Sequence, residues 1–119
     1  MIDLSKIDGI FLYTGKTDLR ASIFGLSLII QESFSIEMMR NKLFVFCNKD
    51  KRNIKIIELD YDGFWLYQKK LHKGKFRWPK LNETSRTMVI DKRQFKWLLD
   101  GLELVQKYAH EDIKIRSNY

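Results

Sequence analysis

Residues 43–71 constrain the fold most, because three runs of β-branched and aromatic residues follow one another there with only short polar breaks. The runs cover residues 43–47, 54–60 and 64–71. The second break contains Asp62-Gly63, a dipeptide that favours a two-residue hairpin turn because it tolerates positive φ. Strands joined by such short connections pair antiparallel. The region therefore predicts an antiparallel meander, with 43–47 at its centre because that run is almost wholly apolar.

Two further segments favour strands near the ends of this region. Residues 10–13 form a short β-branched and aromatic run between two glycines. Residues 76–78 read as a short edge strand that Pro79 terminates. The segment from 80 to 89 is polar and reads as irregular.

Helical spacing occurs on both sides of the meander. After residue 13, Thr17 or Asp18 is suited to cap a helix that fades near Phe34. Near the other end, Asp91 and Gln94 have the spacing of a capping box. The apolar residues of the two helices recur every three or four positions. They are Leu19, Ile23, Leu26 and Ile30 in the first, and Phe95, Leu98, Leu99 and Leu102 in the second.

These elements predict an α+β fold: an antiparallel β-meander of four to five strands with two helices packed on one face. The chain of 119 residues suits one domain, spanning 1–119, that buries its own core. Residues 105–119 show no clear period and are assigned no structure.

The cellular compartment is predicted from the cysteine content and from the absence of long apolar segments. The single Cys47 excludes an internal disulfide framework and, within an apolar run, is predicted to be buried. No secretory signal is recognisable, and nowhere do 18 apolar residues run together. The sequence predicts a soluble, cytoplasmic protein with no membrane partner.

Gly15-Lys16-Thr17 matches the end of a phosphate-binding loop, but the rest of that motif is missing. Such a loop has a glycine five residues before Gly15, where this chain has Ile10. The residues between would also form a strand, whereas a phosphate cradle needs curled backbone amides. We therefore interpret Gly15 as a turn residue and Thr17 as a helix cap.

The net charge of +7 is concentrated in the middle of the chain. Residues 40–80 hold twelve Lys or Arg against four Asp or Glu, so the rest of the chain is close to neutral. A local excess of this kind indicates a polyanionic partner.

Residues 69–80 carry the strongest binding signal: six basic residues, no acid and two aromatic rings. Basic groups neutralise phosphates, and exposed rings stack on unpaired bases. Equally, lysines at sheet edges prevent aggregation and the rings could belong to the core. With the turn near residue 50, the candidate nucleic-acid-binding residues are Lys49, Lys51, Arg52, Lys55, Lys69, Lys70, Lys73, Lys75, Arg77, Lys80, Phe76 and Trp78.

Glu58, Asp60 and Asp62 alternate along a predicted strand and would point to one side of it. Clustered carboxylates can hold a divalent ion, as in metal-dependent nucleases, but they also suit a solvated strand face. His72 and His110 with one cysteine are too few for a zinc site. We predict no catalytic residue, no metal and no cofactor.

The ordered motifs resemble a known family over residues 10–104. They are Thr17-Asp18-Leu19-Arg20 with Gly25-Leu26, Leu43-Phe44-Val45-Phe46, Asp62-Gly63-Phe64, and Gly74-Lys75-Phe76-Arg77-Trp78-Pro79. In this order they are similar to the small accessory protein, TnpB or second open-reading-frame product, of the insertion sequence sixty-six group of bacterial transposable elements. One departure is Leu59, where the family commonly has tryptophan before an acid.

The resemblance implies a role in transposition beside a separate, larger transposase, with no established catalytic residue. The basic region adds the hypothesis that this accessory protein, which is not an enzyme, binds nucleic acid: DNA at the element's ends, or RNA. The alternatives are a protein-interaction module that recruits or stabilises the transposase without touching nucleic acid, and a metal-dependent nuclease using the three carboxylates.

Overall fold

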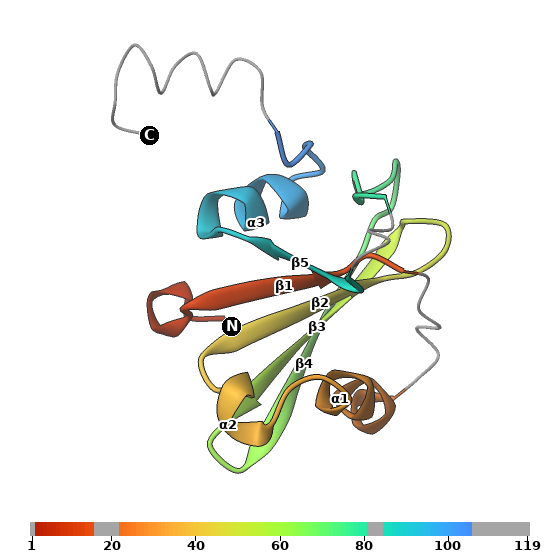
Figure 1. The fold of residues 1–119 in the computed structure, drawn as a ribbon. Helices are drawn as coiled ribbons and strands as arrows, with labels where there is room; N and C mark the ends of the chain where they lie inside the picture. Colours follow the sequence, from red (N-terminus) through yellow and green to blue (C-terminus); the bar gives the residue numbers. More distant parts are fainter. Residues whose placement is uncertain (1, 16–21, 81–84, 106–119) are drawn as a thin grey trace, which may run out of the picture.

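A five-stranded sheet forms the centre of the molecule (Figure 1). The computed structural model describes residues 2–15, 22–80 and 85–105. A 3-10 turn at Leu4–Lys6 precedes the first strand. The strands are β1 (Gly9–Tyr13), β2 (Lys42–Cys47), β3 (Asn53–Asp60), β4 (Gly63–Lys70) and β5 (Thr87–Ile90), and the helices are α1 (Ile23–Gln31), α2 (Ile36–Met39) and α3 (Lys92–Leu99). The strand order is β4-β3-β2-β1-β5; β1 and β2 are parallel and the other neighbours antiparallel.

Helices cover both faces of this sheet, with α3 on one side and α1 and α2 on the other (Figure 1). The central strand β2 requires this arrangement, because its side chains alternate between two buried faces. Leu43, Val45 and Cys47 belong to the α3 face, whereas Phe44 and Phe46 belong to the other. All five are at most 3% exposed.

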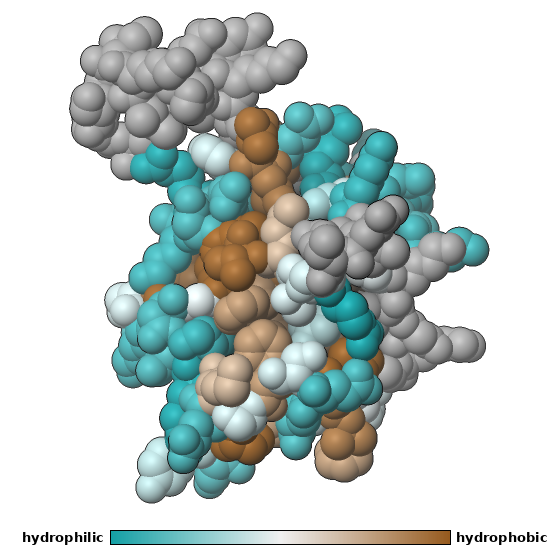
Figure 2. Space-filling view, viewed as in Figure 1, coloured by the Kyte–Doolittle hydropathy of each residue, from teal (hydrophilic) through white to brown (hydrophobic). Residues whose placement is uncertain are grey.

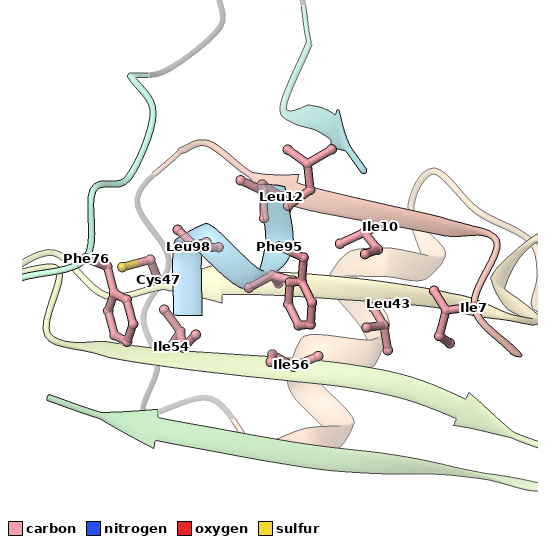
Figure 3. Close-up of a cluster of buried hydrophobic side chains, with 12 residues drawn as sticks. Ile7, Ile10, Leu12, Leu43, Cys47, Ile54, Ile56, Phe76, Phe95 and Leu98 are labelled. Carbon is pink, nitrogen blue, oxygen red and sulfur yellow. The ribbon is translucent and has the colours of Figure 1, made fainter. Parts of the chain in front are cut away.

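On the α3 face, Phe95 and Leu98 of the helix pack onto the sheet (Figure 3). Phe76, from the loop after β4, enters the same core beside Cys47 and Ile54 (Figure 3). The predicted capping box at the start of α3 is confirmed. The Asp91 carboxylate accepts a hydrogen bond from the backbone N–H of Gln94 at 2.7 Å, and the side-chain oxygen of Gln94 accepts one from the backbone N–H of Asp91 at 3.0 Å.

On the opposite face, Leu26 and Ile30 of α1 and Met39 of α2 cover the aromatic side of β2. Ser22 caps α1 and Ser35 caps α2, each accepting a hydrogen bond from a first-turn amide. The helix therefore begins later than the sequence predicted. Residues 17 and 18, expected to cap it, lie outside the described residues.

The α+β class is confirmed, as is the meander of β2, β3 and β4, but two particulars of the prediction were wrong. The sheet is mixed, because the chain between β1 and β2 passes through α1 and α2 and returns β2 parallel to β1. The helices also do not share one face, since the continuous apolar run of β2 buries side chains on both.

Two short segments near residue 80 also differ from expectation. Residues 76–78 are not a strand, because the loop holding them turns Phe76 into the core. The fifth strand is instead β5, which begins inside the segment expected to be irregular and ends one residue beyond it, and it pairs antiparallel with β1. Its four residues, Thr87–Ile90, are too few to show a clear period.

Candidate nucleic-acid interface

The predicted cationic residues gather mainly at one end of the sheet. There β1 and β2 finish, β3 begins and β4 finishes, so the β2–β3 turn and the loop after β4 are neighbours. We call this region the basic end. It comprises Lys49, Lys51, Arg52, Lys70, Lys73, Lys75, Arg77 and Lys80, all of them exposed.

Three hydrogen bonds hold the loop after β4 against this end of the sheet. The Leu71 amide donates to the Arg52 carbonyl at 2.7 Å, and the Phe76 amide donates to the Lys51 carbonyl at 2.7 Å. The Trp78 indole N–H donates to the Tyr13 carbonyl at 3.1 Å. The loop has no regular secondary structure, yet these bonds and the buried Phe76 fix its course.

The β2–β3 turn is shaped by its own side chains. The Asn48 side-chain oxygen accepts from the amides of Arg52 and Asn53, at 3.2 and 3.1 Å. The Asp50 carboxylate also accepts from the Arg52 amide, at 3.1 Å. Lys51 adopts a φ of 62°, the left-handed conformation that glycine or asparagine usually supplies. The turn thus holds a lysine of the basic end in a strained conformation, next to the loop after β4.

Two of the predicted cationic residues, Lys69 and Lys55, lie outside the basic end. Lys69 points to the α3 face, where its ammonium group donates to the Leu99 carbonyl at 2.6 Å. A cation at the carboxyl end of a helix also complements the helix dipole. Lys55 lies within β3, opposite Phe46 of β2 and Gln68 of β4, and is half-buried. We do not include these two lysines in the basic end.

The two predicted aromatic residues are placed differently. Phe76 is 1% exposed and lies in the α3-face core, so its ring offers no surface for a base in this conformation. Trp78 is half-buried and lines two pockets, of about 860 and 440 Å³. Trp78 is therefore the aromatic residue available at the basic end.

The structure adds residues that the sequence did not indicate. Thr14 and Gly15, after β1, line the smaller pocket, and Glu103 and Leu104, after α3, line the larger one. These segments are distant in sequence from the cationic residues, and only the parallel pairing of β1 and the position of α3 bring them close. Glu103 also brings a carboxylate to a largely cationic surface.

The three carboxylates proposed for a metal lie near the opposite end of the β3–β4 hairpin. The Tyr67 hydroxyl donates to Glu58 at 2.7 Å, and burial, followed by this bond, raises the pKa of Tyr67 to about 12. The Trp65 indole donates to Asp60 at 2.6 Å, and Asp62 lies in the turn. Within the described parts of the chain, no group of three or more His, Cys, Asp or Glu is arranged to hold a metal ion.

Comparison with known proteins connects this chain to mobile elements. The family described as "IS66 Orf2 like protein" matches residues 8–109. The chain belongs to the IS66 Orf2-like family. Membership gives it the role of an accessory protein of transposition, as the sequence motifs predicted.

One relative and two negative findings complete the comparison. The chain is 31% identical over 94 residues to "Uncharacterized protein y4hO" of Sinorhizobium fredii (strain NBRC 101917 / NGR234), covering 79% of this chain and 80% of the relative. No solved structure matches the chain. In the part of the chain that the structure describes, none of the helices has the length and apolar character needed to cross a membrane.

Proposed function

We propose that this IS66 Orf2-like protein is a non-catalytic factor that contacts nucleic acid through its basic end while a separate transposase performs the strand chemistry. The supporting observation is the gathering of eight exposed cationic side chains from the β2–β3 turn, the end of β4 and the following loop. Among the described residues, Asp50 and Glu103 bring carboxylates to the basic end. The Asp50 carboxylate accepts a hydrogen bond from the Arg52 backbone amide in its own turn. The local charge is therefore strongly positive.

Such a surface suits the phosphate backbone of DNA or RNA. Lysine and arginine gain affinity by releasing the counterions condensed on the polymer, a contribution that does not depend on base sequence. The basic end would therefore hold the element's nucleic acid without selecting a site. Site choice would come from the transposase.

The salt dependence of binding tests this function. If about five phosphates of duplex DNA are neutralised, log affinity falls against log salt with a slope of about −4 to −5. The measurement is a titration of the purified protein with labelled duplex DNA at several salt concentrations. A slope near zero would remove phosphate contact from the account.

A second function is favoured by apolar side chains left at the surface. Phe24 and Leu28 of α1 are 69% and 47% exposed, and Val89 of β5 is 68% exposed. Figure 2 shows hydrophobic residues gathered in a strip that crosses one face of the molecule between hydrophilic flanks. Exposed apolar surface of this kind marks protein contacts. Recruitment or stabilisation of the transposase is therefore the alternative, and a complex with transposase that survives nuclease treatment supports it.

A further inference from the structure

The smaller pocket at the basic end has the dimensions of a small-molecule site. It lies between the ends of β1 and β2 and the segment Trp78-Pro79-Lys80, with a volume of about 440 Å³. Small-molecule sites commonly have volumes of about 300–1,000 Å³. A DNA duplex, whose diameter exceeds such a pocket, would rest on the rim. The pocket itself has room for one small group that projects from the end of the duplex.

The floor of the pocket is uncharged and buried. Thr14 and Cys47 line it and are 6% and 3% exposed. Burial raises the pKa of the Cys47 thiol from 9.0 to about 12, so this side chain is a neutral thiol near pH 7. A neutral floor of this kind accepts an aromatic or apolar group more readily than a charged one.

One wall of the pocket is aromatic and fixed in place. The Trp78 indole is held by its hydrogen bond to the Tyr13 carbonyl at 3.1 Å, and Pro79 continues the same wall. Because the ring is already positioned, a base that stacks on it loses little affinity to side-chain ordering. Every nucleobase has a π-face, so stacking of this kind tolerates any sequence.

The rim of the pocket is cationic. Lys49, Lys51 and Lys80 line it, and no carboxylate does so among the described residues. Asp50 lies between two of these lysines in sequence but lines a different pocket, beside Arg52 and Lys70. The arrangement therefore combines an aromatic wall and a neutral floor with ammonium groups at the opening.

We propose that this pocket receives one unpaired nucleotide, with its base against Trp78 and its phosphate at the lysine rim. The inference rests on the proposed nucleic-acid contact and deepens it, because it adds a preference for DNA with an unpaired end over blunt duplex. The pocket needs no phosphate-binding loop, since its cations come from the β2–β3 turn and the loop after β4. Free mononucleotides share this chemistry.

The test compares two labelled DNAs in anisotropy titrations at one salt concentration. One is a short blunt duplex, and the other has the same number of nucleotides with a few of them in a single-stranded overhang. Wild-type protein is expected to bind the overhang DNA about tenfold more tightly, which is about 1.4 kcal/mol and within the range of base–aromatic stacking. Trp78→Leu and Trp78→Phe both lose the indole hydrogen bond to the Tyr13 carbonyl, so the two variants are compared with each other, and in Trp78→Leu the ratio of overhang to blunt-duplex affinity should fall to about one. Trp78→Phe keeps a ring and should keep most of the preference.

The rate at which a thiol reagent labels Cys47 in wild-type protein gives a second test, which needs no substituted variant. Cys47 is the single cysteine and lines the pocket, so a small thiol reagent modifies one known position there, and comparison of the two DNAs at equal saturation cancels the slow reaction of a buried thiol. Overhang DNA should slow this labelling about threefold or more relative to blunt duplex at equal saturation. Protection by deoxyadenosine monophosphate alone would support the pocket and identify a free nucleotide as its occupant.

The failures of the two proposals are distinguishable. Equal binding of blunt and overhang DNA by wild-type protein, with equal Cys47 labelling, would overturn the pocket assignment and leave the phosphate contact standing. Binding to neither DNA would overturn both. A preference that persists undiminished in Trp78→Leu would overturn the role of the ring.

Discussion

The backbone N–H of Phe76 donates a hydrogen bond to the carbonyl oxygen of Lys51 at 2.7 Å. This bond joins the two cationic segments that the sequence separates by β3 and β4. Phe76 itself is 1% exposed and packs in the α3-face core. The basic end is therefore built on the hydrophobic core, and its geometry depends on Phe76 although that ring is inaccessible.

Phe76→Ala should destabilise the protein by about 3–5 kcal/mol, because removing a buried phenyl ring loses its transfer free energy and leaves a cavity. Urea denaturation followed by circular dichroism measures this loss. Phe76→Leu is the control and should cost less, about 1–2 kcal/mol, because it refills most of the cavity. An unchanged unfolding midpoint in Phe76→Ala would contradict the placement of this ring in the core.

Lys51 allows charge and backbone strain to be separated at one position. Its φ of 62° is unfavourable for a residue with a Cβ atom, so Lys51→Gly relieves strain that Lys51→Ala retains. We expect the glycine variant to be more stable than the alanine variant by about 0.5–1 kcal/mol. Both lose the same charge and should lose similar affinity for DNA.

Thermal unfolding and DNA titration of the two Lys51 variants check this prediction. A greater stability of Lys51→Ala would show that the turn does not hold residue 51 in the left-handed conformation. Affinities equal to that of wild-type protein in both variants would remove Lys51 from the interface.

Much of the fold could be predicted because local patterns and packing agree. The runs at 43–47, 54–60 and 64–71 became β2, β3 and β4, and the capping box at Asp91 formed as expected. The parallel pairing of β1 could not be read locally, because it depends on where α1 and α2 pack. Even so, the unbroken apolar run of β2 contained a signal for helices on both faces.

The composition of the candidate site could be read from the sequence, whereas the meeting of its two cationic segments could only be hypothesised. The cationic residues were identifiable from charge alone, but their convergence depends on the sheet register and on hydrogen bonds such as that from Trp78 to Tyr13. Phe76 and Trp78 are alike by residue type and differ only in tertiary position. The sequence pattern alone does not show which of two aromatic residues, two positions apart, lies in the core and which lines a pocket.

Alkaline pH should destabilise the fold partly through Cys47. Burial raises the pKa of its thiol to about 12 from 9.0, so the unfolded state releases this proton more readily. The stabilising contribution is present below pH 9 and is lost as the pH rises from 9 toward 12. Cys47→Val should remove this part of the decline.

Denaturant titrations between pH 8 and 11 measure this effect. Burial also raises the pKa of Tyr13 to about 12 from 10.0, so the Cys47→Val variant should begin to lose stability about one pH unit later than wild-type protein. Identical pH profiles for the two proteins would show that Cys47 is not desolvated in the folded state.

The central claim is that affinity for duplex DNA depends on where the positive charges lie and not on their total number. Two variants with equal net charge test it. The first replaces Lys49, Arg77 and Lys80 of the basic end by alanine. The second replaces Lys6, Arg40 and Lys92, which are also exposed but lie near the opposite end of the sheet, where β1 and β2 begin and β5 finishes. Each variant loses three positive charges.

Binding of duplex DNA by these two variants across salt concentrations is the most direct measurement. The basic-end variant should bind about 10- to 100-fold more weakly at low salt, and its salt slope should be shallower by about 2–3 units, because up to three phosphate contacts are lost. The opposite-end variant should stay within about threefold of wild-type protein. Equal losses of affinity in the two variants would contradict the account, because binding would then follow net charge and not the basic end.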